Sequence, residues 1–182
     1  MSTISSPSVA ERSPAVARRA PPVAADPEVA RDEIVCRVAR TDDELAEHFR
    51  VRQEIFVHAQ GLFDDDRDEH DDDPATLHVV AMTPAGCVGA VRLYPIAGDR
   101  EWKGDRLAVL ATARAHHVGQ GLVRCAVAIG GARGGRRMLA YVQRPVVEFF
   151  EHLGWTPVGD VFSYCGVDHR RMSIALRREP DR

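Results

Sequence analysis

Apolar positions follow a helical period in one part of the chain and form short runs in others. In segment 42–57 they recur at helical spacing, and Thr41 with Glu44 three residues later has the capping-box spacing of a helix start. Apolar runs bounded by turn residues predict strands. These runs cover residues 34–39, 77–82, 87–94, 105–111 and 138–142, and the turn at 83–86 makes the second and third a β-hairpin.

The second half of the chain contains the remaining elements. Pro145 and Gly154 frame a helix, because proline is favoured at the start of a helix and glycine just past its end. Another helix is expected over 122–132, and segments 157–164 and 171–176 indicate a final pair of strands. The order β-α-β-β-β-α-β-α-β-β predicts an α/β (α+β) fold in which helices pack on a mixed sheet.

Residues 1–32 differ from the rest in composition, being rich in Ala, Pro, Ser and Arg without an aromatic residue. Such a segment buries too little apolar surface to offset the entropy of ordering, so a disordered tail is expected. A targeting peptide is the alternative, although Glu11, Asp26 and Glu28 suit a transit peptide poorly. The expected organisation is this tail, one domain over 33–178 and a C-terminal tail at 179–182.

Composition narrows the class of partner. The 182 residues are 45% hydrophobic and carry a net charge of -3, which suits one compact domain and gives no basic field for nucleic acid or an anionic membrane. No apolar run approaches the roughly 20 residues that span a bilayer. The four cysteines form no C-x-x-C pair, which argues against a zinc ribbon or a disulfide scaffold. We expect a cytoplasmic protein that binds small molecules, and a homodimer is compatible with this composition.

A glycine-containing segment offers the first candidate chemistry. In RLAVLATARAHHVGQGLVRCAV a strand passes through a loop with Gly119 and Gly121 into a helix. Glycine lets a backbone approach its ligand, and the free N–H groups and positive dipole end of a helix N-terminus favour a pyrophosphate. A strand-to-helix turn without any ligand would show the same glycines, so the segment alone leaves both interpretations open.

The wider pattern resembles the GNAT N-acetyltransferase superfamily. Its motif A, R/Q-x-x-G-x-G/A, compares with His116-x-x-Gly119-x-Gly121, and FFEHLGW at 149–155 is similar to its later FYEKLGF-like element. VRQEIFVHAQG resembles a helix of GNATs related to acyl-homoserine-lactone synthases, while RLYP, W-x-G-x-RLAV and YCGVDHRRM resemble the nitrogen starvation N-acetyltransferase subgroup. The resemblance covers about residues 34–177. It implies the GNAT fold, a mixed and mostly antiparallel central sheet with helices on both faces.

The resemblance also implies a cofactor site, for acetyl-CoA or another acyl-CoA as co-substrate and without a metal. Backbone groups of Leu107, Ala108 and Val109 would pair with the pantetheine arm as an added strand does. The remaining implied cofactor contacts are Arg114, His116, His117, Val118, Gly119, Gln120, Gly121 and Gln143.

Three positions depart from the family pattern. His116 stands where Arg or Gln is usual, with Arg114 two residues earlier, and Gln143 stands where many members have Asn. Phe150 occupies the position of the tyrosine that commonly protonates the leaving CoA thiolate, and phenylalanine has no proton to donate. The usual general acid is therefore absent from its position.

Three other residues are candidates for the acid and base roles. Tyr164 and His169 lie in the YCGVDHRRM segment, and Glu54 lies on the first predicted helix. Each has a plainer alternative, which is a packed sheet aromatic for Tyr164, a solvated turn residue for His169 and a solvated helix position for Glu54. His78 either lines the acceptor cleft or is a half-buried structural histidine. Arg92 is expected on the opposite side of its strand from Val91 and Leu93.

The segment 64–73 holds eight acidic residues and one arginine. It fails the EF-hand pattern, since Glu69 stands where a glycine is required and Ala75 where the bidentate glutamate is required. A solvated loop is the favoured interpretation. A lid that selects a cationic substrate and a metal site are the alternatives.

Three functions remain open from the sequence. The leading one is an N-acetyltransferase that passes an acyl group from acyl-CoA to a primary amine of a small molecule by direct attack. A CoA-binding or interaction module of GNAT fold without turnover is the second, because of Phe150 and the altered loop. An enzyme like acyl-homoserine-lactone synthases, or an N-acyl amino acid synthase, is the third.

Overall fold

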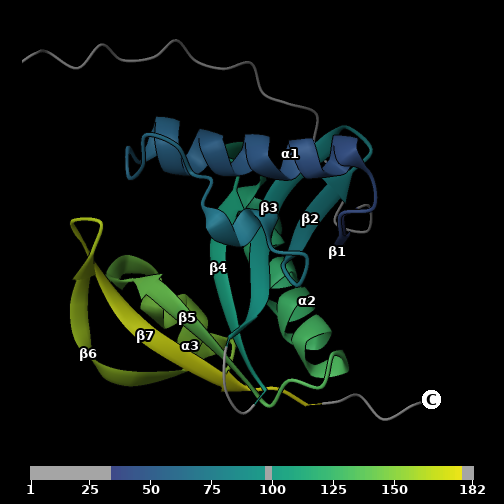
Figure 1. Ribbon diagram of the computed structural model, residues 1–182. Coiled ribbons are helices and arrows are strands. Elements are labelled where there is room, and N and C mark those ends of the chain that lie inside the picture. The colour runs from purple at the N-terminus through teal and green to yellow at the C-terminus, as the bar shows by residue number, and fades with distance from the viewer. Residues whose placement is uncertain (1–33, 97–99, 178–182) are drawn as a thin grey trace, which may run out of the picture.

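The computed structural model describes residues 34–96 and 100–177. Seven strands form one sheet in the order β1-β2-β3-β4-β5-β7-β6, in which only the β4–β5 pair is parallel (Figure 1). The strands are β1 (Val35–Val38), β2 (Leu77–Thr83), β3 (Gly86–Ile96), β4 (Glu101–Val109), β5 (Arg137–Gln143), β6 (Thr156–Tyr164) and β7 (Val167–Ala175). The predicted mixed, mostly antiparallel sheet is confirmed. The expected tails at 1–32 and 179–182 lie outside the described residues.

Three α-helices and four other helical segments accompany the sheet. The α-helices are α1 (Asp42–Gln53), α2 (Val118–Ala132) and α3 (Val147–His152). A π-helix (Glu54–Ala59) continues α1, and 3₁₀ segments cover Glu69–Asp72, Ala111–His116 and Arg144–Val146.

The start of α1 follows the predicted cap with one change. The Thr41 hydroxyl accepts a hydrogen bond from the Glu44 N–H at 3.2 Å. The Glu44 carboxylate, however, accepts from the N–H of Arg40 at 2.8 Å and pairs with Arg37 of β1. The helix start is thus tied to the edge strand as well as capped.

Alternating residues of β2 assign the helices to opposite faces of the sheet. Val79 and Ala81 belong to the larger core cluster, which includes Val118 and Leu122 of α2. Val80 belongs to a second cluster, with residues of α1 and the π-helix. Figure 1 shows α1 and α2 on different sides of β2, β3 and β4, so the prediction of helices on both faces is confirmed.

Two element boundaries differ from the sequence prediction. Strand β4 begins at Glu101 rather than at 105, because its first residues pair with β5. Helix α2 begins at Val118, so Gly119 and Gly121 lie in its first turn and not in a preceding loop. The 3₁₀ segment before it ends at His116, and the next residue, His117, has a left-handed φ of 58° that turns the chain into α2. Within the described ranges, every helix is too short or too polar to cross a bilayer.

Candidate active site

Strands β4 and β5 diverge shortly after they meet, and we call this place the β4–β5 fork. Their parallel pairing ends with Lys103 opposite Leu139, after two earlier pairs. β4 nevertheless continues to Val109 and β5 to Gln143. Between residues 104–109 of β4 and 140–143 of β5, the described chain supplies no further registered pair. The fork edge of β4 therefore presents backbone N–H and C=O groups to any extended ligand that enters.

A β-bulge lies in the middle of the same strand. The register between β3 and β4 shifts between Ala90 and Arg92, and Arg106 has a positive φ of 52°. Non-glycine residues rarely adopt this conformation, and bulges re-aim the groups around them. The bulge thus changes the direction of the β4 backbone just inside the fork.

The N-terminus of α2 follows the end of β4 through the 3₁₀ segment. The first N–H groups of an α-helix have no partner within the helix. Here the first bond back into the chain comes from Gly121, whose N–H donates to the His117 carbonyl at 3.1 Å. The N–H groups of Val118, Gly119 and Gln120 precede this bond. They remain available to a ligand at the positive end of the dipole of the 15-residue helix α2.

The two glycines of this turn face different neighbours. A Cβ on Gly119 would lie 3.6 Å from Cζ of Phe149 and 3.8 Å from Cγ2 of Val109, which places it beside the end of β4. A Cβ on Gly121 would lie 3.2 Å from Sγ of Cys36, in the packing between α2 and β1. Gly119 is therefore the one whose missing side chain leaves room near the fork.

The other residues implied as cofactor contacts are arranged around this place. Leu107, Ala108 and Val109 follow the β4 bulge, and Ala108 and Val109 pair with β3 alone. His116 is half-buried and His117 exposed in the connection to α2. Arg114 is exposed there, with Nε 3.5 Å from the Val109 carbonyl oxygen. Gln143 ends β5 on the far side of the fork, where its amide donates to Gln60 at 3.0 Å.

Of the three acid-base candidates, the structure brings two together. Tyr164 at the end of β6 is 40% exposed, and its ring centroid lies 5.5 Å from that of His169. His169 is buried within β7, with Nδ1 2.8 Å from the Val167 carbonyl oxygen, so the interpretation as a solvated turn residue is wrong. It is wrong because β7 begins at Val167, earlier than the apolar pattern indicated. Glu54 is exposed and bonds His58 one turn on.

Phe150 belongs to the core rather than to an open site. It is buried, and its ring packs edge-on against Phe149 and Trp155 at centroid distances of 5.5 Å and 5.4 Å. The position of the missing tyrosine is therefore filled by core packing.

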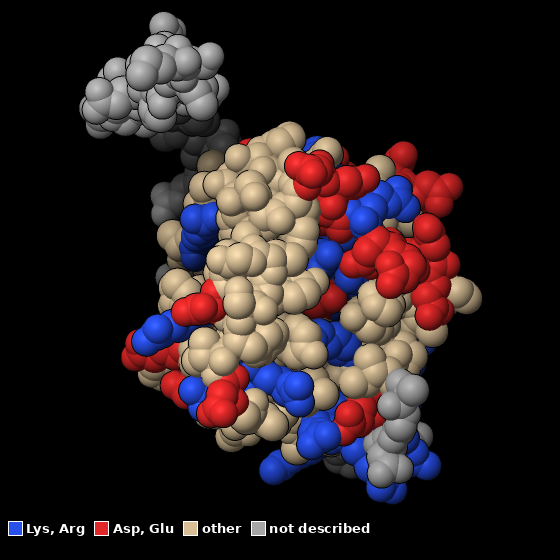
Figure 2. Space-filling model, turned by 60° about the vertical axis from the view of Figure 1, so that its left-hand side comes forward, with Lys and Arg blue, Asp and Glu red and all other residues tan. Residues whose placement is uncertain are grey.

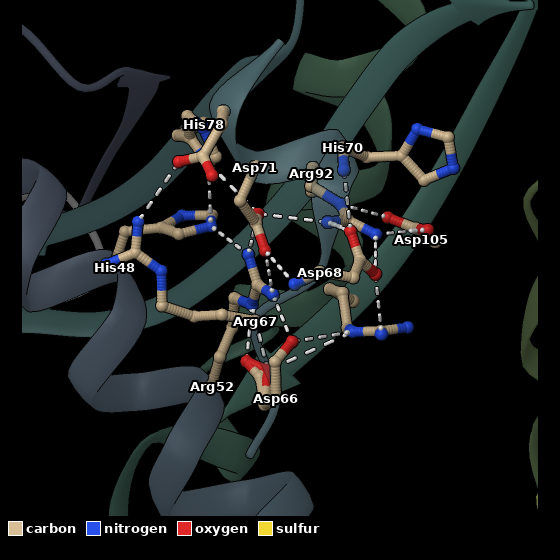
Figure 3. Close-up of polar contacts among 12 residues, drawn as sticks. His48, Arg52, Asp66, Arg67, Asp68, His70, Asp71, His78, Arg92 and Asp105 are labelled. Atoms are coloured by element: carbon tan, nitrogen blue, oxygen red, sulfur yellow. Dashed lines mark hydrogen bonds and ion pairs between the residues drawn. The ribbon is translucent and has the colours of Figure 1, made fainter. Parts of the chain in front are cut away.

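A network of buried ion pairs lies between α1, the acidic segment and strands β3 and β4 (Figure 3). It joins the arginines Arg52, Arg92 and Arg106 to the aspartates Asp66, Asp68, Asp71 and Asp105. The favoured interpretation of segment 64–73 as a solvated loop is therefore wrong for three of its acids, while the others are exposed.

Arg52 holds one side of this network. Its guanidinium lies 2.6 Å from carboxylate oxygens of both Asp66 and Asp71, and it is fully buried. Burial alone would raise the pKa of Asp71, but the hydrogen bonds and charge of Arg52 outweigh burial, and the pKa lies well below its usual range. The charged hydrogen bonds of Arg52 thus hold the segment that carries Asp66 and Asp71 in place over the sheet.

Arg92 forms the other side of the network, and its side chain points into the protein rather than into solvent. It is fully buried on the α1 face of the sheet, bound to Asp68 at 2.6 Å and to Asp105 at 2.9 Å. Arg106, at the β4 bulge, bonds Asp68 at 3.0 Å. The network therefore fixes the bulge from the α1 side, while the fork edge of β4 stays free.

Two histidines adjoin the network. His48 is buried, with Nδ1 3.2 Å from the Val79 carbonyl oxygen and Nε2 3.4 Å from Nη1 of Arg52. Burial first, and then the charge of Arg52, lowers the pKa of His48 to about 3, so the ring is neutral and can accept at Nε2. His78 is half-buried with Nδ1 3.3 Å from Nε2 of His48, which supports the structural interpretation of this residue.

Lys103 was missed by the sequence analysis. It lies at the vertex of the fork, is only 8% exposed, and its Nζ is 2.8 Å from the centroid of the Tyr141 ring. Burial lowers its pKa to about 8, Asp105 opposes this change, and Arg171 and Arg106 add to it. One signal could have found it, because Lys103 is the only lysine among the chain's 24 lysine and arginine residues.

Charged residues are unevenly distributed over the surface on this side of the molecule. In Figure 2, acidic residues gather along one side of the face, with basic residues next to them and a broad uncharged area beyond. In the part of the chain that the structure describes, no group of three His, Cys, Asp or Glu side chains is placed to hold a metal ion. The acidic side chains of the network, Asp66, Asp68, Asp71 and Asp105, are bound by arginines instead.

A family model of the acetyltransferase (GNAT) family matches residues 38–155, well over half of the chain. The chain belongs to this family. Membership supports acyl transfer from CoA as the chemistry of this chain. The comparison with curated proteins gives no match.

Solved structures show the same fold at low sequence identity. A protein from Lactobacillus plantarum is 20% identical with a TM-score of 0.71, covering 79% of this chain and 98% of its own. An aminoglycoside 6'-N-acetyltransferase complexed with coenzyme A is 16% identical with a TM-score of 0.66, covering 81% and 99%. The CoA-dependent acyl-homoserine lactone synthase BjaI is 22% identical with a TM-score of 0.64, covering 76% and 78%.

Proposed function

We propose that the chain is an N-acyltransferase that passes an acetyl or other acyl group from acyl-CoA to a primary amine of a small molecule. The observation that carries the proposal is the β4–β5 fork, where an unpaired strand edge leads to the free N–H groups at the start of α2. The pantetheine arm would pair with β4 beyond the bulge, and the pyrophosphate would bind Val118, Gly119 and Gln120. The proposal includes a cytoplasmic location, where acyl-CoA is available.

The chemistry follows from the position of the thioester inside the fork. The lone pair of a neutral amine attacks the thioester carbon, and N–H groups of β4 stabilise the developing oxyanion. The C–S bond then breaks, the attacking nitrogen loses a proton to solvent, and CoA leaves with the electron pair as a thiolate, which takes up a proton from solvent or from Tyr164. Tyr164 is exposed and keeps its hydroxyl free for this role, while Phe150 has no proton to give.

Two other functions of this fold remain as outcomes of the test. A CoA-binding module would bind acyl-CoA and transfer nothing. An enzyme like BjaI or an N-acyl amino acid synthase would prefer a longer acyl chain, which must fit between the separated strands.

Thermal unfolding with acetyl-CoA and with octanoyl-CoA tests binding first. A ligand at 100 times its Kd that binds only the folded chain stabilises it by about 2.7 kcal/mol, which gives a clear rise in Tm. Release of CoA is then measured by chromatography with a panel of primary amines. Amine-dependent release supports the transferase, binding without release supports the module, and no binding of either thioester by folded protein refutes both.

A further inference from the structure

The side chain of Lys103 is buried, and in the part of the chain that the structure describes its charge has no anionic partner. Among the described residues, no carboxylate lies within 4.0 Å of its ammonium and no acceptor is within hydrogen-bonding distance, although the side chain is only 8% exposed. Its Nζ lies over the face of the Tyr141 ring. A cation–π contact compensates an ammonium only in part, so this charge is costly where it lies.

The position of Lys103 is at the vertex of the fork, on the side of the sheet that α1 covers. Lys103 forms the last registered pair of β4 with β5, and it pairs with Tyr94 on β3. Two carboxylates lie two residues away in sequence, and both are already paired. Asp105 is held by Nε and Nη2 of Arg92 at 2.9 Å, and Glu101 pairs with Arg137. The titratable and charged groups that face Lys103 from the surrounding strands are Tyr94, Asp105, Arg106, Tyr141 and Arg171.

The protonation of Lys103 is poised near neutral pH. Burial lowers its pKa to about 8, and the positive charges of Arg171 and Arg106 act in the same direction against Asp105. A sizeable fraction of neutral amine is therefore present at physiological pH, and a base whose pKa lies near the working pH is the most effective.

The choice of lysine at this position is informative. The chain uses arginine at every other basic position, including all three cations of the buried network. Arginine binds anions better than lysine but stays protonated in proteins, whereas a buried lysine gives up its proton readily. The single lysine of the chain therefore stands at a buried position where its side chain, unlike that of arginine, can lose and regain a proton.

We propose that Lys103 is the general base of the acyl transfer. The acceptor arrives as an ammonium ion, and neutral Nζ of Lys103 takes one of its protons, which leaves a neutral amine and a charged Lys103. As the amine forms the C–N bond and the C–S bond breaks, its nitrogen gives up a second proton, which reaches the CoA thiolate through water. Lys103 returns the first proton to solvent. This inference rests on the proposed function, and it assigns the proton transfer to a residue rather than to water.

The first test measures the ionisation of Lys103 without any turnover. Because the chain has a single lysine, lysine labelled with ¹³C at Cε gives one side-chain NMR signal. This signal is expected to titrate near pH 8, well below the value of about 10.4 for a free lysine. A signal that titrates at the free value overturns the proposal.

The second test compares pH profiles of kcat/KM for two acceptor amines of different pKa. A base must be neutral to act, so the wild-type rate rises with pH and levels off above about 8 for both amines. Lys103→Met and Lys103→Arg are both expected to lose about 100-fold or more in kcat, together with this inflection, while the KM for acyl-CoA is unchanged. The arginine variant keeps the charge, so it separates a base from a site that only binds an anion.

Chemical rescue guards against a merely structural effect. A tertiary amine, which cannot be acylated, is expected to restore part of the activity of Lys103→Ala. Amine-dependent CoA release that persists in Lys103→Met with an unchanged pH profile overturns the base role and leaves the transferase intact. A wild-type chain that releases no CoA with any amine overturns both proposals.

Discussion

Gln143 at the end of β5 donates a hydrogen bond to the side chain of Gln60, 83 residues earlier in the sequence, with a distance of 3.0 Å. Gln60 follows the π-helix that continues α1. The bond therefore ties the far strand of the fork to the helical layer that covers β4, on the side where the strands are not paired with each other.

The hydrogen bond between Gln143 and Gln60 is expected to make a small but measurable contribution to the free energy of unfolding. A hydrogen bond of this kind is worth about 0.5–1.5 kcal/mol net, and these side chains are largely solvated, so the lower end applies. A double-mutant cycle with Gln60→Ala and Gln143→Ala, followed by urea unfolding, measures the coupling free energy directly. A coupling of zero would show that the two side chains do not meet in solution.

Arg52 is expected to be indispensable for the fold. Arg52→Met keeps most of the side-chain volume but removes the cation that lies 2.6 Å from both buried aspartates, Asp66 and Asp71. Of the described arginines, Asp71 then keeps only Arg92 at 2.9 Å, and Asp66 keeps only Arg106 at 3.9 Å. Breaking such a buried pair costs about 3–5 kcal/mol, so the midpoint of urea unfolding should fall sharply.

The matched control is Arg50→Met, which removes an exposed pair with Glu47 and one hydrogen bond to the Cys87 carbonyl and should cost about 1 kcal/mol or less. Equal losses in the two variants would contradict the burial of the network.

The sequence predicted the elements well because their signals are local. Thr41 with Glu44, and Pro145 with Gly154, mark helix ends through neighbouring residues, and strands β1 to β5 each contain an apolar run. The arginine–aspartate network could not be predicted in this way. Arg52 meets Asp66 across 14 residues and Arg106 meets Asp68 across 38, so the acidic run looked solvated when its partners were distant in the chain.

The candidate site was predicted in part for the same reason. Gly119 lies at the helix start that the motif indicated, because motif and helix are contiguous. The vertex of the fork depends on the register of Lys103 with Leu139, which are brought together by a parallel pairing across α2. Periodicity carries no information about that register, so Lys103 was overlooked.

Stability is expected to fall as the pH drops from about 6.5 towards 3. Burial keeps His48 neutral in the folded state, with a pKa of about 3, while the unfolded chain takes up a proton near pH 6.5. The unfolded state therefore binds more protons in this window, and this one group gives a slope of up to about 1.4 kcal/mol per pH unit. Asp71, whose pKa is lowered, continues the loss below the ordinary aspartate value.

The measurement is urea unfolding at a series of pH values with wild type and His48→Gln. The variant is expected to be less stable at pH 7, since the buried ring is lost, but to show a shallower slope between pH 6.5 and 4. An unchanged slope would mean that His48 is protonated in the folded chain, contrary to its contacts with Arg52 and the Val79 carbonyl.

Gly119 offers a test in which stability and ligand affinity move in opposite directions. A side chain there would meet only ordinary contacts, and Ala in a helix is more favourable than Gly by about 0.5–1 kcal/mol. Gly119→Glu adds a negative charge at the helix N-terminus, which further stabilises the free protein. The same charge repels a pyrophosphate bound to the N–H groups, so the Kd for acyl-CoA should rise about tenfold or more relative to the uncharged Gly119→Gln. Gly121→Ala, which points at Cys36, should leave that Kd unchanged. Equal affinities of the Glu and Gln variants at low salt would place the pyrophosphate away from the start of α2.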